Sequence, residues 1–383
     1  MADKPRFVGE RVRLGELCDI CSGGTPKRSV SEYWNEGTIP WVKISDITGK
    51  YVSSTEERIT EKGLKGSSAK MLAPGTLLYS IFASIGAVGV LEIPATSNQA
   101  IAGLSIKTDK VEQDYLYHYL KSREMLAKSS GRGAAQNNIN LTILRAMEVP
   151  VPTIGEQRVI VGRLEGVAGQ IEQARTQLNQ LDSLVKSRFV EMFGDPKLEP
   201  NKWSTKTLGE VCVTRLGKML DAKRQTGECS YPYLANTNVQ WFHFDLTDLR
   251  QMDFSDEDRI EFGLRNGDVM VTEGGEIGRC AIWREEIPNC FFQKAVHRVR
   301  CDSEVLLPEY FVWCFKMKAD LGLFEPYVSQ STIAHLTGKK IKQVPIPLPP
   351  LALQQEFAAF VAQVDKSRFV AQQQIDKLQM LYD

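Results

Sequence analysis

The stretch VPVPTIGEQRVIVGRLEG, residues 149–166, has a counterpart in VPIPLPPLALQQEFAAFV, residues 344–361. Each begins with alternating valine or isoleucine and proline, and each continues into a segment with helical apolar spacing and glutamine near its start. Proline fixes its own φ and disfavours helical backbone in the residue before it, so residues 149–152 and 344–350 should be extended. A helix can begin only afterwards. The chain therefore makes the same joint twice, from an extended exit into a helix.

The repetition extends beyond these joints, at an offset of about 195 residues, which is typical of a duplicated domain with its linker. The apolar skeleton recurs while the polar loop residues differ. The matched pairs are LGELCDI (from Leu14) and LGEVCVT (from Leu208), IPWVKISDI (Ile39) and YPYLANTNV (Tyr231), PGTLLYSIFASIGAVGVL (Pro74) and NGDVMVTEGGEIGRCAIW (Asn266), DYLYHYLKS (Asp114) and PEYFVWCFKM (Pro308), and GAAQNNINL (Gly133) and VSQSTIAHL (Val328). This pattern predicts two domains that share a fold and present different surfaces.

After each domain, apolar residues recur at alternating spacings of four and three residues. This heptad spacing is typical of a helix that packs along a partner helix, and the apolar stripe it forms is called the seam below. Helices packed on their own domains are one interpretation. We favour pairing of the two helices with each other, because both seams are narrow and both follow equivalent domains, and the connector after Gly194 makes the pair antiparallel. The predicted pairing residues are Ile160, Leu164, Val167, Ile171, Leu178, Leu181, Val185, Phe357, Val361, Val364, Ile375 and Leu378.

These features predict an α+β protein with a pseudo-two-fold arrangement: two similar α/β domains joined by two long helices in an antiparallel coiled coil. The expected divisions are 1–153 and 195–350 for the domains, and 154–194 and 351–383 for the helices. With 383 residues, 43% of them hydrophobic, the chain can fill real cores. No apolar run approaches the ~20 residues needed to span a bilayer, and the N-terminus lacks a signal-peptide core, so the cytoplasm is expected.

Charge and cysteine usage narrow the possible functions. Lysine plus arginine equals aspartate plus glutamate at 47 each, so a nucleic-acid surface must come from local placement of charge. Of the eight cysteines, Cys18 and Cys21 form a C-x-x-C pair without a second pair or nearby histidine, and we expect plain reduced thiols. His118, His243, His297 and His335 have no ligand pattern around them, so no metal site is predicted.

Taken together, these features make the chain resemble a known family, the specificity subunits of type I restriction-modification systems. The resemblance covers nearly the whole chain and rests on LGELCDICSGGTPKR (14–28) followed by IPWVKISDI, on the two proline exits into helices, and on IEQARTQLNQLDSLVKSRFVEMFGDP (171–196). It implies two target-recognition domains, each reading one half of a split, asymmetric DNA sequence, with the helices setting the gap between the halves.

The resemblance also implies partners and cofactors. Double-stranded DNA is the ligand, and two modification (methyltransferase) subunits that carry S-adenosylmethionine are the first partners. Restriction subunits that use ATP and Mg²⁺ to translocate and cut DNA can join them. This chain itself is expected to bind no cofactor and no membrane.

Reading bases requires donors and acceptors on loops held at base edges, with cations and amides gripping phosphate. The first-domain candidates are Thr25, Lys27, Arg28, Lys43, Ser45, Arg132, Gln136, Asn137 and Asn138, with Asp46 nearby; the second-domain candidates are Arg224, Asn236, Asn238, Arg279, Gln330, Ser331, Thr332, Lys339 and Lys340. Each could equally be a solvated loop residue or a turn former. Gln136 and Gln330 recur in both halves and are expected to hold phosphate. Glu273 and Glu276 either accept from a cytosine amino group or are ordinary loop acids, and we favour the latter.

Two rival functions remain. An enzyme needs its chemistry, and the chain contains no GxxxxGK[ST], GxGxxG or HExxH sequence and no Asn/Asp-Pro-Pro-aromatic motif for methyl transfer to a base amino group. A scaffold would explain the helices but not the divergent polar loops on duplicated domains. The sequence therefore predicts a non-catalytic DNA-specificity subunit, without indicating which bases it reads.

Overall fold

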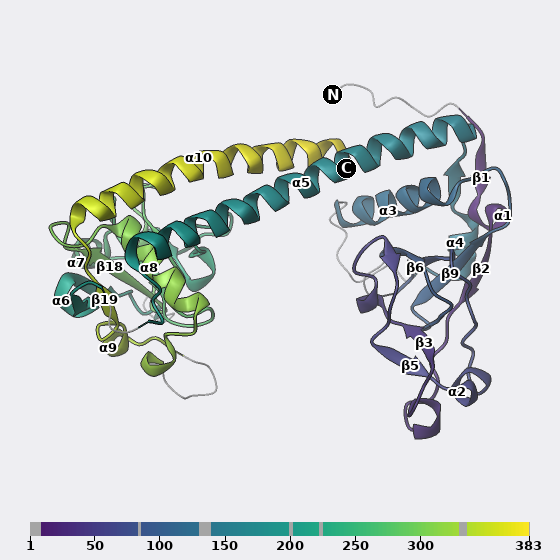
Figure 1. Cartoon of the computed structure of the whole chain (residues 1–383), viewed down its shortest axis with the longest axis horizontal. Helices are drawn as coiled ribbons and strands as arrows, with labels where there is room; N and C mark the ends of the chain where they lie inside the picture. The colour runs from purple at the N-terminus through teal and green to yellow at the C-terminus, as the bar shows by residue number, and fades with distance from the viewer. Residues whose placement is uncertain are drawn as a thin grey trace. The chain divides into compact units, whose positions relative to one another are not determined.

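The computed structural model describes residues 9–82, 86–129, 139–198, 202–221, 225–328 and 335–382. The chain divides into two compact units, one formed by Met1–Gln173 with Gln374–Asp383 and the other by Ala174–Gln373. Each unit thus contains one domain and a part of both long helices (Figure 1). No helix within these described ranges is long and apolar enough to cross a membrane.

The first domain contains ten short strands and four helices among its described residues. The strands are β1 (Arg11–Arg13), β2 (Cys18–Ser22), β3 (Ile39–Val42), β4 (Tyr51–Val52), β5 (Glu57–Ile59), β6 (Leu77–Ser80), β7 (Val88–Leu91), β8 (Thr96–Ser97), β9 (Ile101–Ile106) and β10 (Glu148–Pro150). The helices are α1 (Leu14–Leu17), α2 (Glu61–Lys65), α3 (Gln113–Ser129) and α4 (Leu141–Ala146), with 3-10 turns η1 (Ser31–Tyr33) and η2 (Ile44–Asp46).

The second domain repeats most of this order, without a counterpart of β4 among its described strands. Its strands are β11 (Thr205–Thr207), β12 (Cys212–Leu216), β13 (Ser230–Leu234), β14 (Arg250–Asp253), β15 (Val269–Thr272), β16 (Cys280–Ile282), β17 (Phe291–Phe292), β18 (Val296–Cys301) and β19 (Pro345–Pro347). Its helices are α6 (Leu208–Val211), α7 (Asp256–Phe262), α8 (Pro308–Asp320) and α9 (Gly338–Ile341), with 3-10 turns η4 (Asn236–Asn238) and η5 (Glu325–Tyr327). The two proline exits are the strands β10 and β19, as predicted.

The sheet topology confirms the duplication. The larger sheet has the order β2-β9-β6-β7-β4 in the first domain and β12-β18-β15-β16 in the second. The three-stranded sheets β5-β3-β8 and β14-β13-β17 also correspond, as do the pairs β1-β10 and β11-β19. A backbone contact explains one shared residue: a Cβ at Gly23 would lie 2.2 Å from the Asn98 carbonyl oxygen, and one at Gly217 would lie 2.4 Å from that of Gln293. Only glycine allows this approach after β2 and β12.

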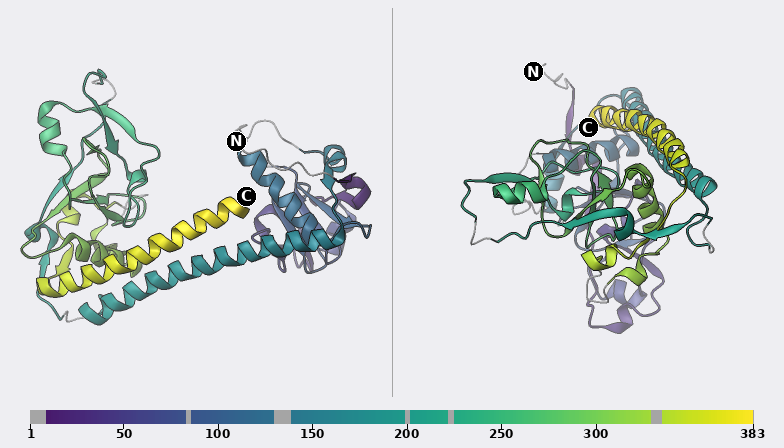
Figure 2. Two further views of the ribbon diagram at one scale, coloured as in Figure 1. Left: turned by 90° about the horizontal axis from the view of Figure 1, so that it is seen from above. Right: turned by 90° about the vertical axis from the view of Figure 1, so that its left-hand side faces the viewer.

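The long helices are α5 (Ile154–Phe193, 40 residues) and α10 (Leu351–Tyr382, 32 residues). They begin directly after the proline exits and lie side by side in both figures (Figures 1 and 2). In the second unit Arg188 pairs with Glu356 at 2.7 Å and Asp182 pairs with Arg368 at 2.6 Å. Because the residue numbers rise on one helix as they fall on the other, α5 and α10 run antiparallel.

The burial of the predicted pairing residues follows one face of each helix. Ile171, Val185, Phe357, Val361, Val364 and Ile375 are buried, and Leu164, Val167, Leu178, Leu181 and Leu378 are partly buried. Ile160 corrects the prediction, because it is 39% exposed while its neighbour Val161 is buried in the core of the first domain. The first turns of α5 thus pack on the helix's own domain, so each of the two interpretations describes part of the helix.

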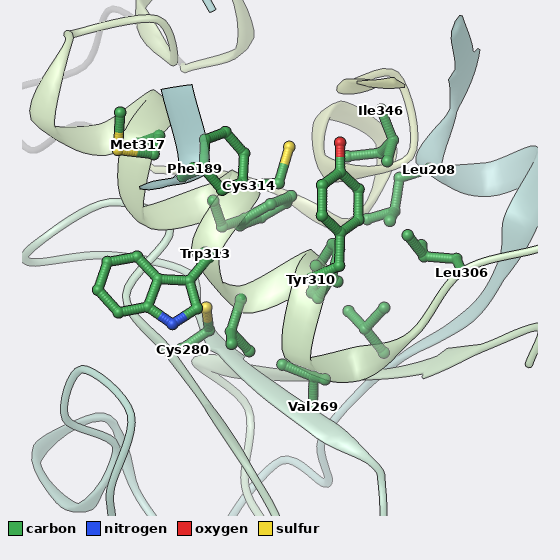
Figure 3. Packing of buried hydrophobic residues seen from close by; sticks show 14 of the residues in the cluster. Phe189, Leu208, Val269, Cys280, Leu306, Tyr310, Trp313, Cys314, Met317 and Ile346 are labelled. Carbon is green, nitrogen blue, oxygen red and sulfur yellow. The ribbon is translucent and has the colours of Figure 1, made fainter. Parts of the chain in front are cut away.

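The core of the second unit joins its helices to its sheet. Figure 3 shows Phe189 of α5 beside Tyr310 and Cys314 of α8, with Leu208 and Ile346 close to the Tyr310 ring. The rings of Phe189 and Tyr310 stack with their centroids 5.8 Å apart, and Phe357 of α10 meets Phe189 edge-on at 5.6 Å. Burial of these large rings stabilises the contact, since each removes well over 100 Å² from water. The helix pair is therefore anchored in the domain core.

Candidate nucleic-acid interface

Two tryptophans hold the first-domain loop that follows β2. The indole N–H of Trp41 donates to the Gly24 carbonyl at 2.9 Å, and that of Trp34 donates to the Lys27 carbonyl at 3.2 Å. The two rings meet edge-on with centroids 5.0 Å apart. Loop residues 24–28 are thus fixed at the backbone, while the side chains of Lys27 and Arg28 remain exposed. A loop of this kind presents cations from a rigid support.

Two of the predicted cations converge on one carboxylate. Arg28 lies 3.7 Å above the Trp34 ring centroid and pairs with Glu57. Lys43 pairs with the same Glu57 at 2.9 Å and with Glu56 at 2.6 Å. The hydrogen bond from Arg28, followed by that from Lys43, lowers the pKa of Glu57, so this carboxylate stays ionised. In the free protein the cations are therefore neutralised, and a phosphate must compete with Glu56 and Glu57 for them.

The remaining described candidates of this domain differ in role. Thr25 bonds to Gln99, and Ser45 is exposed on η2. Asp46 accepts the backbone N–H of Lys43 at 2.7 Å and so closes the η2 turn. Its counterpart in the second domain is Asn238, which accepts the backbone N–H of Ala235 at 2.8 Å. The turn after the central strand is therefore closed in the same way in both domains.

Asn238 and Arg279 are predicted DNA-binding residues whose side chains bond within their own domain in the structure. Asn238 is 4% exposed, and its amide donates to the carbonyls of Asp245 at 2.8 Å and Asp248 at 3.2 Å. Arg279 donates to the Asn236 carbonyl at 3.0 Å, and its side chain is 16% exposed. Both side chains help to hold the turn 236–238, and the amide of Asn238 is fully bonded inside the domain, as a buried polar group requires, whereas the Nε of Arg279 has no partner among the described residues. Their role toward DNA stays a prediction.

Asn236 itself is partly buried. Its amide donates to the Gly274 carbonyl at 3.1 Å, while its side-chain oxygen has no partner among the described residues. Glu276 accepts a hydrogen bond from the indole of Trp241, which favours the interpretation of this acid as an ordinary loop residue. The turn 236–238 and the loop 273–279 thus hold each other in place.

A cleft of about 480 Å³ in the second domain gathers several charged side chains. It lies between β12, the start of β18 and α9, and it brings Glu273 and Lys339 together. Sequence reasoning did not connect Arg215, His297 and Lys342 with this site, although all three line the cleft. The exposed position of Arg215 in the alternating strand CVTRL was the only available signal for it.

The floor of this cleft is held by His297. The ring is 1% exposed, and its Nε2–H donates to the Leu336 carbonyl at 3.1 Å. Burial lowers the pKa of His297, so the imidazole is neutral at pH 7. The charges that face a ligand in the cleft are therefore those of Glu273, Arg215, Lys339 and Lys342, of which Arg215 pairs with Glu261. Lys340, on the same turn as Lys339, is partly buried.

Eight of the predicted DNA-binding residues lie outside the described part of the chain, among them every candidate in the two matched glutamine loops. They are Arg132, Gln136, Asn137, Asn138, Arg224, Gln330, Ser331 and Thr332. Their roles stay predictions.

The buried glutamine at each helix start is the residue that ties a domain to its helix. Gln157 donates to the carbonyls of Lys110 at 2.8 Å and Pro152 at 2.9 Å, and accepts the Glu112 N–H at 2.9 Å. Gln354 donates to the carbonyls of Val305 at 2.9 Å and Pro349 at 2.8 Å, and accepts the Leu307 N–H at 2.9 Å. Both side chains are fully buried. The joint is thus built identically in the two domains.

A tyrosine completes each joint. The Tyr115 hydroxyl donates to the Pro150 carbonyl at 2.8 Å, and the Tyr310 hydroxyl donates to the Pro347 carbonyl at 3.1 Å. The polar skeleton is therefore duplicated in detail, whereas the candidate ligand-facing residues are not. This arrangement defines a class of protein, a duplicated recognition module. Its two domains differ in their exposed surfaces, and each is joined to a long helix by the same buried contacts.

Comparison with known proteins identifies the family. The model of the type I restriction modification DNA specificity domain matches the chain twice, at residues 9–183 and 200–380. The MjaIX specificity subunit of Methanocaldococcus jannaschii is 25% identical over 97% of this chain and 90% of its own length. The EcoR124I/EcoR124II specificity subunit of Escherichia coli is 31% identical over 40% of this chain and 39% of its own length.

Solved structures share the fold. The S subunit of a type I restriction-modification system from M. genitalium superposes with a TM-score of 0.52 at 16% identity, covering 100% of this chain and 96% of that one. A chain from a structure of type I R-M complex assembly gives a TM-score of 0.63 at 20% identity, covering 97% of this chain and 95% of that one. The chain belongs to the type I restriction-modification DNA specificity family.

Proposed function

We propose that this chain is the DNA sequence-specificity subunit of a type I restriction-modification complex and has no active site of its own. Each domain reads one half of a bipartite, asymmetric DNA target, and the α5–α10 pair sets the spacer between the halves. Double-stranded DNA and two modification subunits are its partners, and restriction subunits can join them. S-adenosylmethionine, ATP and Mg²⁺ serve those partners, and the complex works in the cytoplasm.

One observation carries this proposal: the two domains keep the same buried joint while their exposed loops differ. The joint consists of Gln157 and Tyr115 in one domain and Gln354 and Tyr310 in the other. At the matched turns, the exposed residue is Ser45 in one domain and Thr237 in the other, and Lys43 corresponds to Ala235. Two domains with unlike exposed surfaces, both attached to the α5–α10 helix pair, suit an asymmetric target made of two parts.

The charge arrangement supports a ligand with negative charge and polar edges. Arg28 and Lys43 in the first domain, and Lys339 and Lys342 in the second, are cations beside carboxylates. Phosphate would displace Glu56 and Glu57 from Lys43 and Arg28, so part of the binding energy is spent on breaking ion pairs. Binding through such cations releases counterions and weakens steeply as salt rises.

The test measures methylation by the assembled complex. The chain is expressed with and without its modification subunits in a host that lacks both, and the methylated positions of the host DNA are mapped. We expect one bipartite sequence with a constant gap, methylated only when both proteins are present. Methyl transfer by the purified chain alone, supplied with S-adenosylmethionine and the same DNA, would sink the non-catalytic assignment. A single continuous target would sink the two-head assignment.

A further inference from the structure

Two cysteines of the second domain stand directly opposite each other across an antiparallel pair of strands. Cys212 begins β12 and Cys301 ends β18, and the two are partners in the strand register. The flanking backbone bonds run from Asp302 N to Val211 O at 3.0 Å and from Gly217 N to Val296 O at 3.1 Å. Hydrogen-bonded and non-hydrogen-bonded pairs alternate along such a ladder, so the cysteines occupy a non-hydrogen-bonded position.

This position brings the two side chains within reach of a covalent bond. Opposite Cα atoms at non-hydrogen-bonded sites lie about 4.5 Å apart, and a disulfide needs a Cα separation of about 4.4–6.8 Å. Both side chains project from the same face of the sheet, because paired residues point the same way. A hydrogen bond between the two thiols, together with burial, raises the pKa of Cys301. Both residues remain partly exposed.

The other cysteines lack this combination. In the first domain Cys18 holds the place of Cys212, but its register partner is Ile106 and it is 1% exposed. Cys280 and Cys314 approach each other in the core of the second unit, where they are 0% and 3% exposed. Cys212 and Cys301 instead face each other at the rim of this core, where each residue is partly buried and partly exposed.

We propose that Cys212 and Cys301 form a reversible redox site that a peroxide closes into a disulfide. The Cys212 thiolate attacks one peroxide oxygen, becomes a sulfenic acid and releases hydroxide, which leaves as water with the thiol proton. The Cys301 sulfur then attacks the Cys212 sulfur, and the sulfenic oxygen leaves as a second water. Two thiols and one peroxide thus give one disulfide and two waters, and an added dithiol reverses the reaction.

The consequence of closure follows from the place of β12 in the sheet. Within the four-stranded sheet β12 is the edge strand and pairs with β18 alone. Thr214, Arg215 and Leu216 at its far end line the charged cleft, and His297 of β18 faces them. A bond at the other end of the same two strands fixes β12 to its neighbour. It therefore restrains opening of this wall of the cleft.

The experiment treats the purified full-length chain with hydrogen peroxide, blocks free thiols with N-ethylmaleimide and digests the unfolded protein with trypsin. We expect a joined peptide made of residues 207–215 and 301–316, with Cys314 alkylated, and we expect dithiothreitol to separate it. Cys212→Ser and Cys301→Ser should each abolish it, while the matched control Cys314→Ser should keep it. Absence of the joined peptide in the unsubstituted chain, or its persistence in Cys301→Ser, overturns the proposal.

A second measurement tests the consequence for β12. Amide hydrogen exchange at residues 212–216 should become slower after peroxide treatment, because opening of an edge strand limits exchange there. The equivalent residues 18–22 of the first domain should be unchanged, as should residues 212–216 in the peroxide-treated Cys301→Ser chain. Equal exchange before and after disulfide formation would overturn the restraint on the cleft wall.

Discussion

Two adjacent glutamines at the start of α10 differ sharply in environment, which makes them a direct test of the joint. Gln354 is fully buried and makes three hydrogen bonds to backbone, whereas Gln355 beside it is exposed. Gln354→Met should lower the free energy of unfolding by about 2–4 kcal/mol, because it leaves one N–H and two carbonyls without partners. Gln355→Met should have almost no effect. Urea unfolding of both variants gives the comparison, and equal stabilities would contradict the role of the joint.

Two buried histidines predict how stability depends on pH. Burial lowers the pKa of His297 and of His118 below the ordinary value near 6.5. As the pH falls through ~6.5 the unfolded chain gains protons that the folded chain does not. The contribution of these histidines to the free energy of unfolding is therefore complete above this pH and is lost progressively below it. Each histidine contributes a slope of at most about 1.4 kcal/mol per pH unit. Urea midpoints from pH 7.5 to 5.5 should fall less in the His118→Gln, His297→Gln double variant, and an unchanged slope would refute this.

At the scale of elements, α5 offers neighbouring residues on opposite faces. Val185 is fully buried in the core of the second unit, whereas Leu184 is 49% exposed. Val185→Asp places a carboxylate among apolar side chains, and protonating it at pH 7 costs roughly 4 kcal/mol. Leu184→Asp keeps its charge in water. Thermal unfolding should show a large loss of stability for the first variant and little for the second; similar losses would mean that the face is misassigned.

The length of α5 predicts the spacer. Four residues inserted near Gln180 add about 6 Å of helix at 1.5 Å per residue. If the helix pair separates the two reading domains on DNA, this insertion should change the gap between the half-sites and leave their sequences intact. Mapping of methylated sites made by the complex measures both. A stable, active variant with the original gap would show that the helices do not set it.

At the scale of the whole molecule, the two heads should be separable. Ser45→Ala in the first domain and Thr237→Ala in the second change the exposed residues of the two matched turns, and distant sites combine nearly independently. Each substitution should alter the bases selected in one half-site, at about 1–3 kcal/mol for a lost base contact. Lys339→Ala should instead weaken binding evenly across sequences, as loss of a phosphate contact does. Selection from a random DNA library decides this, and a change in both halves from one substitution would exclude independent reading.

The local pattern of the chain was sufficient to predict its architecture. Proline chemistry located the two exits, β10 and β19, and the starts of α5 and α10 after them, because these effects act within a few residues. The apolar seams predicted most of the buried helix positions for the same reason. Ile160 was misplaced because a heptad pattern does not say whether a turn packs on a partner helix or on its own domain.

The roles of individual polar residues depended on the tertiary structure. Asn238 and Arg279 are of residue types that often contact DNA bases. In the structure both side chains donate hydrogen bonds to backbone carbonyls that the fold brings near. In the sequence Gln157 and Gln354 are only a residue type that recurs at the start of both helices. The structure shows that each side chain is buried and makes three hydrogen bonds to backbone. Arg215, His297 and Lys339 come from separate segments and meet in one cleft. Backbone preference and apolar period are local properties that a sequence carries directly, whereas hydrogen-bond satisfaction and burial depend on residues far apart in the chain, which only folding brings together.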